Sequence, residues 1–123
     1  MLDVLGFIHN HGWCHGDVRP EHALVHPEDH AVRLIGWGFA RKGADAKQKA
    51  EDLSRSARVV QVLLYGGSGV KPANLPPGFA KLVTQAAEDP DFCHAHGARG
   101  LDALLLAEAR AAFGPPAFVP LIL

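Results

Sequence analysis

The sequence predicts a mainly α domain of the α+β class, in which one small β-hairpin precedes a group of helices. Apolar residues recur at helical spacing in several stretches that end at glycine or proline, and two short apolar segments flank a turn near residue 28. The chain has 123 residues, of which 48% are hydrophobic, and this is enough for one core. We therefore expect a single domain over residues 1–123.

The first part of the chain, residues 1–12, is expected to hold the end of a helix. Its apolar residues lie close to helical spacing, at Leu2, Leu5 and Ile8. Gly12 is a suitable helix stop. Residues 13–15 are then expected to be extended, and residues 17–21 to form a loop because Pro20 cannot lie in a helix interior.

The β-hairpin is predicted within residues 13–41. Its two strands are expected at residues 23–25 and 31–35, where β-branched and apolar residues gather. The turn between them covers residues 27–30, because proline presets the turn dihedral and aspartate can bond the nearby backbone.

A central helix is predicted for residues 47–65. Its apolar residues fall on one side, at Leu53, Val59, Val60, Leu63 and Leu64. The glycine-rich stretch from Gly66 to Gly69 is expected to end this helix.

The last part of the chain is predicted to hold further helices over residues 70–113. After a loop at residues 72–77, one helix is expected at 78–87, and Asp89-Pro90 breaks it. A final helix is expected at 101–113 and is terminated by Gly114-Pro115-Pro116. Residues 114–123 form an apolar tail, which we expect to pack on the core, on a partner or on a further domain.

Composition and charge exclude several classes of function. The formal net charge is −1, so we expect no nucleic-acid partner. No apolar run approaches the ~20 residues that span a bilayer, and the start of the chain lacks a signal peptide. We therefore expect no membrane association. The chain has two cysteines, Cys14 and Cys93, too few for a disulfide scaffold, which favours the reducing cytoplasm.

Two segments carry the most specific pattern. Residues 15–25 read HGDVRPEHALV, and residues 34–41 read LIGWGFAR. Together they resemble the catalytic loop, H-x-D-[LIV]-[KR]-P-E-N, and the D-F-G turn of the protein-kinase-like phosphotransferases. The resemblance covers residues 5–65 well and the rest only by helix layout. It implies a helical kinase C-lobe, in which the hairpin bears these two segments and residues 47–65 form the buried central helix.

The resemblance assigns roles to four positions in the loop and turn. Asp17 takes the place of the catalytic base, and Arg19 that of a residue touching the transferred phosphate. His22 replaces an asparagine and Gly36 an aspartate, the two side chains that hold magnesium in the family. Magnesium prefers oxygen ligands, so we expect both metal positions to be non-functional and Asp17 to be a vestigial base. Alternatively, Asp17 serves the loop itself by bonding its backbone.

Three further residues are implied to be structural. His15 is expected to pack against Trp37, the residue in place of the D-F-G aromatic. Asp52 is expected to anchor the catalytic loop through its backbone amides. Only 14 residues precede His15, and neither G-x-G-x-x-G nor a V-A-I-K strand occurs. We therefore expect a C-lobe without its N-lobe and no cofactor.

A separate reading concerns zinc, because imidazole and thiolate are good zinc ligands. The candidates are His9, His11, Cys14, His15, His22, His26, His30, Cys93, His94 and His96. Their spacing fits no zinc-finger pattern, and scattered surface histidines are the simpler interpretation. We expect no metal site.

These observations leave two hypotheses for function. The first is a non-catalytic, pseudokinase-like module whose open cleft face, around Trp13, Asp17, Trp37 and Phe39, binds another protein or domain. The second is part of an active ATP-dependent kinase for a protein or small molecule, with its N-lobe on another chain or truncated. The H-G-D form and the short gap before Asp52 resemble aminoglycoside phosphotransferases. Only this second hypothesis calls for Mg-ATP.

Overall fold

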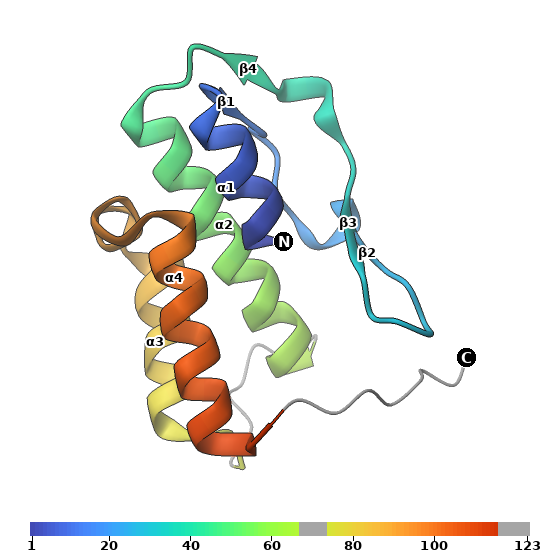
Figure 1. Ribbon diagram of the computed structural model, residues 1–123, viewed down its shortest axis with the longest axis vertical. Helices are drawn as coiled ribbons and strands as arrows, with labels where there is room; N and C mark the ends of the chain where they lie inside the picture. The colour runs from blue at the N-terminus through green and yellow to red at the C-terminus, as the bar shows by residue number, and fades with distance from the viewer. Residues whose placement is uncertain (67–73, 116–123) are drawn as a thin grey trace.

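The computed structural model describes residues 1–66 and 74–115 (Figure 1). Residues 67–69 of the expected glycine-rich stop, residues 72–73 of the predicted 72–77 loop and residues 116–123 of the predicted apolar tail lie outside the described residues. The elements are α1 (Leu2–Asn10), β1 (Trp13–Cys14), β2 (Ala23–Val25), β3 (Val32–Leu34), β4 (Arg41–Lys42), α2 (Ala46–Tyr65), α3 (Pro77–Glu88) and α4 (Pro90–Phe113).

The predicted fold class is confirmed, because the described residues are mainly helical and their strands are short and antiparallel. The predicted hairpin is β2–β3. In addition, β1 pairs with β4 across a long connection to form another two-stranded sheet, which the sequence analysis did not predict. The β2–β3 hairpin projects to the side of the helices, whereas β1 and β4 lie beside the end of α1 (Figure 1).

Helix α2 is the centre of the helical part, since it packs against α1, α3 and α4. A capping box starts it: the Asp45 carboxylate accepts from the Gln48 amide at 2.8 Å, and the Gln48 side chain accepts from the Asp45 amide at 2.9 Å. Gly66 ends it in a backbone conformation with φ of 63°. The buried hydroxyl of Ser54 donates to the Ala87 carbonyl at 2.8 Å and ties α2 to α3.

Helix α4 begins eleven residues before the predicted start at 101, because Pro90 opens a helix here as well as ending the previous one. Asp89 is its N-cap and accepts from the Phe92 amide at 3.1 Å. The helix bends at Gly97, whose φ of 69° and ψ of 177° are non-helical. The expected loop at 17–21 also contains regular structure at its end, because residues Pro20–His22 form a 3₁₀ turn with proline at its first position.

The core lies between α2 and the elements that pack on it. Its buried apolar residues include Leu5, Val18, Leu34, Leu53, Val59, Val83, Cys93 and Leu101. Val18 and Leu34 place the loop after β1 and the end of β3 against the helices, so the core fixes both segments of the catalytic-loop-like pattern. Within the described residues, no helix is long and apolar enough to cross a membrane.

Candidate functional site

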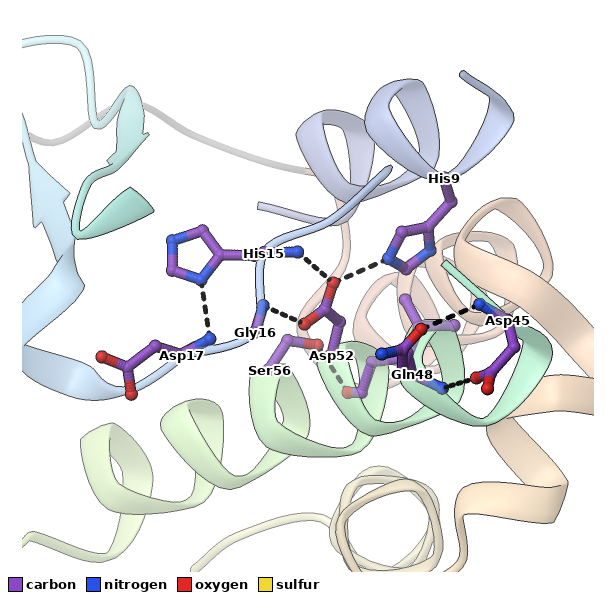
Figure 2. Close-up of polar contacts among 9 residues, drawn as sticks. His9, His15, Gly16, Asp17, Asp45, Gln48, Asp52 and Ser56 are labelled. Carbon is purple, nitrogen blue, oxygen red and sulfur yellow. Dashed lines mark hydrogen bonds and ion pairs between the residues drawn. The ribbon is translucent and has the colours of Figure 1, made fainter. Parts of the chain in front are cut away.

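The loop after β1 is held by the carboxylate of Asp52 in α2 (Figure 2). Asp52 is 1% exposed. Its Oδ2 accepts from the His15 amide at 2.7 Å, and its Oδ1 accepts from the Gly16 amide at 2.9 Å. A buried carboxylate is stable only when hydrogen bonds replace its hydration. Asp52 therefore joins the central helix to the loop, because its buried carboxylate needs hydrogen-bond donors and the two loop amides need an acceptor.

A third partner of Asp52 is His9, a residue that the sequence analysis placed only among the scattered histidines. Its Nε2 lies 2.9 Å from Asp52 Oδ2, and both side chains are buried. His9 lies one helical turn after the buried Leu5, on the same face of α1. That spacing is the sequence signal that could have identified it as an inward-facing residue.

His15 links the loop to the turn that follows β3. Its Nδ1 accepts from the Asp17 amide at 3.1 Å, and its Nε2 lies 2.8 Å from the Ile35 carbonyl. An acceptor at Nδ1 and a carbonyl at Nε2 require the tautomer with its proton on Nε2. The edge of the ring contacts Trp37, with ring centroids 4.5 Å apart. His15 is fully buried, so these contacts position the loop and the turn against each other.

Asp17 lies beside two potential cations. Its Oδ2 is 3.6 Å from Arg19 Nε and 3.6 Å from His22 Nδ1. Among the described residues, no backbone amide donates to its carboxylate, which is the bond expected if Asp17 stabilised its own loop. Arg19 also lies 3.9 Å from the Glu21 carboxylate, so it is placed between two acidic side chains.

His22 and Gly36, which stand at the metal-ligand positions of the kinase pattern, contact each other. Gly36 has a φ of 75°, and a Cβ built on it would lie 2.4 Å from ring atoms of His22. The Nδ1 of His22 is 2.8 Å from the Asp17 carbonyl, to which it donates. The ring therefore fills the space beside residue 36, and the nitrogen that faces Asp17 has no lone pair for a metal ion.

Gly16 is a second residue whose importance the sequence analysis missed. Its φ is 84°, and a Cβ there would lie 2.6 Å from the Phe39 carbonyl oxygen. Only glycine fits both the left-handed backbone and this close approach. The H-G-D form of the loop is the sequence signal.

The zinc candidates form no metal site in the described part of the chain. Among the described residues, no group of three or more His, Cys, Asp or Glu side chains lies close enough to hold a metal ion. Both cysteines are buried free thiols. Burial raises the pKa of Cys14, with a smaller contribution from the Asp52 carboxylate. Burial likewise raises the pKa of Cys93 to about 11, which disfavours the thiolate needed for reactivity.

Large aromatic side chains around the loop are exposed. Trp13 is 41% exposed, Trp37 is 40% exposed and Phe39 is 64% exposed. They come from β1 and from the turn after β3, on either side of the loop that Asp52 holds. The residues expected to border an open face are therefore exposed, and Asp17 between them is partly buried.

Comparison with curated proteins finds short matches to protein kinases. The chain is 46% identical over 41 residues to human serine/threonine-protein kinase VRK3, a stretch covering 32% of this chain and 9% of that kinase. It is 38% identical over 40 residues to casein kinase II subunit alpha' of Saccharomyces cerevisiae, covering 32% of this chain and 12% of that subunit. It is 36% identical over 42 residues to the maternal embryonic leucine zipper kinase of Danio rerio, covering 34% of this chain and 6% of that kinase.

No protein-family profile matches the chain, and a search of solved structures finds no significant match. The similar stretches span between 6% and 12% of the three kinases. All three matched proteins are kinases, the family whose pattern the 15–25 and 34–41 segments resemble. Over about a third of its length, this chain therefore has a kinase-like relationship.

Proposed function

We propose that this chain is a degenerate kinase C-lobe that transfers no phosphate and acts as a regulatory or interaction module. Its catalytic-loop face binds another protein or domain. Phosphoryl transfer depends on metal ions that neutralise the charge developing on the phosphate. The residues in place of the metal ligands cannot meet that requirement.

The contact between His22 and Gly36 carries the proposal. Gly36 has no side chain to offer, and the space beside it is taken by the His22 ring. The Nδ1 of that ring donates to the Asp17 carbonyl. The Asp17 carboxylate lies 3.6 Å from Arg19 Nε and 3.6 Å from His22 Nδ1. Both neighbours present nitrogen atoms, and neither offers the oxygen ligand that magnesium prefers. The loop keeps its shape through Asp52 but lacks a cation site.

The exposed aromatic residues supply the interaction surface. Trp13, Trp37 and Phe39 are exposed on segments before and after the loop, and the few residues that dominate binding energy in protein interfaces are enriched in large aromatic side chains. The loop and the turn are fixed by buried hydrogen bonds, so the surface is preorganised, which lowers the entropy lost on binding.

A matched pair of variants tests the surface. Phe39 is 64% exposed on the proposed face, and Phe7 is 65% exposed on α1. We expect Phe39→Ser to abolish capture of a partner from the source cell, whereas Phe7→Ser retains it. Equal capture by wild type and Phe39→Ser would remove the support for this face. Thermal melts of both variants establish that each is folded.

The alternative is part of an active ATP-dependent phosphotransferase, and the geometry of Asp17 favours it in one respect. Its carboxylate is not used to bond loop amides, so it stays available to accept a proton. A melt with and without Mg-ATP separates the two functions. An active site would add ~2.7 kcal/mol at a hundred times the dissociation constant. We expect no Mg-ATP-dependent shift, and a shift that Asp17→Asn abolishes would establish the alternative.

A further inference from the structure

A cavity of about 360 Å³ lies away from the catalytic-loop face, between α1, the first half of α2 and the bend in α4. The bend at Gly97 turns α4 so that residues on both of its sides line this cavity. The packing of α4 against α1 and α2 makes its walls. At this point Gly6 of α1 and Ala98 of α4 are in close contact, since a Cβ on Gly6 would lie 3.3 Å from the Ala98 Cβ.

The polar lining of the cavity is basic. Lys49 of α2 and Arg99 of α4 border it, together with the imidazoles of His94 and His96 and the side-chain amide of Asn10. No carboxylate is among the lining residues. Within the part of the chain that the structure describes, neither Lys49 nor Arg99 forms an ion pair. Both side chains therefore line the same cavity without an ion-pair partner among the described residues.

Acidic side chains elsewhere on these helices lie outside the cavity lining. Asp45 caps the start of α2, where its carboxylate accepts from the Gln48 amide. Asp52 lies beneath His9 and is occupied by His9 and two loop amides. Asp3 and Asp102 border an adjoining hollow that Arg99 also lines, and Asp3 is paired with the N-terminal amine at 3.1 Å.

The inner surface of the cavity is apolar. Ala50, Leu53, Cys93 and Ala98 line it and are buried. A site with an apolar floor and converging polar groups is typical of small-molecule pockets. Two cations on different helices, with amide and imidazole donors beside them, suit an anion with several oxygens better than a single carboxylate. The apolar floor favours a ligand that carries an organic group as well.

We propose that this cavity binds the phosphate monoester of a small organic molecule. The phosphate lies between Lys49 and Arg99, and the organic group rests on Leu53 and its apolar neighbours. The inference does not rest on the proposed function. The cavity shares no residue with the loop after β1 or with the exposed aromatic residues, and His9, which also contacts Asp52, is the residue that connects it to the loop anchor.

The neighbouring surface on α2 provides a matched control. Lys47, two residues before Lys49, lines a different hollow that also contains Glu51 and Asp52. In that hollow the basic Arg55 is paired with Glu51 at 3.0 Å. Lys47→Ala therefore removes the same charge from the same helix without touching the proposed site.

Isothermal titration calorimetry of the full chain with phenyl phosphate, and separately with inorganic phosphate, tests the proposal. We expect saturable binding of phenyl phosphate, weakened about tenfold or more by Lys49→Ala or Arg99→Ala because each removes a charged hydrogen bond. Lys47→Ala should leave it unchanged, and Lys49→Arg should retain most of it. Inorganic phosphate should bind more weakly, because it leaves the apolar floor uncovered.

Three results would overturn the proposal. They are the absence of saturable binding of phenyl phosphate, an equal loss in Lys47→Ala and Lys49→Ala, and inorganic phosphate that binds as tightly as phenyl phosphate. The first result would show that the cavity does not bind a phosphate monoester. The second would show that binding depends only on general surface charge. The third would show that the organic group does not contribute to binding. None of them bears on the catalytic-loop face, whose test depends on Phe39.

Discussion

The imidazole ring of His22 occupies the space that a side chain on Gly36 would need, with ring atoms 2.4 Å from the position of a Cβ. His22 belongs to the 15–25 segment, and Gly36 lies near the start of the 34–41 segment. A backbone bond from the Ile35 amide to the His22 carbonyl, 2.8 Å long, keeps them together. The substitutions at these two positions therefore fit each other.

This relationship predicts a coupled effect on stability. Gly36→Ala should destabilise the fold by about 2–3 kcal/mol, because the backbone there has a positive φ and the added methyl meets the ring. In a His22→Ala background the same substitution should cost about 1 kcal/mol less, since the ring is gone. Chemical denaturation of the four variants in a double-mutant cycle measures the difference. Additive effects would show that the contact is relaxed in solution.

The bonds of Asp52 predict a large effect at a single position. Asp52→Ala leaves the amides of His15 and Gly16 without acceptors in a buried site, so we expect a loss of ~2–3 kcal/mol in the free energy of unfolding. The neighbouring Glu51 forms a partly exposed pair with Arg55, and Glu51→Ala should cost only a few tenths of a kcal/mol. A thermal melt in which both variants behave alike would contradict the anchoring role.

Gly16 and Gly43 offer a comparison between two glycines with positive φ. A Cβ on Gly16 would lie 2.6 Å from a backbone oxygen of Phe39, whereas a Cβ on Gly43 would have nothing within 4 Å. Gly43→Ala should cost about 1 kcal/mol from backbone strain alone. Gly16→Ala should cost at least about 1 kcal/mol more, because the backbone oxygen cannot move aside easily. Urea denaturation of both variants measures the difference, and equal losses would refute the close approach.

The buried thiol of Cys93 leads us to expect that the stability of the fold decreases at alkaline pH. Burial raises the pKa of its thiol from an ordinary 9.0 to about 11, so the folded state holds the proton more tightly than the unfolded chain. Its contribution to stability is complete below pH 9 and is lost as the pH rises through about 11. We expect the free energy of unfolding to fall over this range in the wild type and to fall less steeply in Cys93→Ala. Identical slopes would place the thiol in contact with water.

Much of the helical structure could be predicted from local patterns. The capping residues Asp45 and Gln48 and the apolar face after them define α2. By contrast, the start of α4 could not be found, because residues 90–100 carry two glycines and two histidines with no apolar repeat, and Pro90 fits both a helix stop and a helix start. The pairing of β1 with β4 joins two-residue strands far apart in the chain, a contact for which no local signal exists.

The sequence identifies the residues of the candidate site but not the contacts between them. The motif identifies Asp17, His22 and Gly36, but only the three-dimensional structure shows that the His22 ring packs against Gly36. The bond from His9 to Asp52 joins residues 43 positions apart. Such a pair depends on how α1 docks on α2, and that docking is decided by packing of the whole core rather than by any short segment.

The measurement that most directly tests the proposed absence of catalytic chemistry is an NMR titration with Mn²⁺, which prefers the same oxygen ligands as magnesium. Its paramagnetism broadens the amide signals of residues near a bound ion. We expect no site-specific broadening at Asp17, His22 or Gly36 in the wild type. Broadening centred on these three residues, and abolished by Asp17→Asn, would contradict the account.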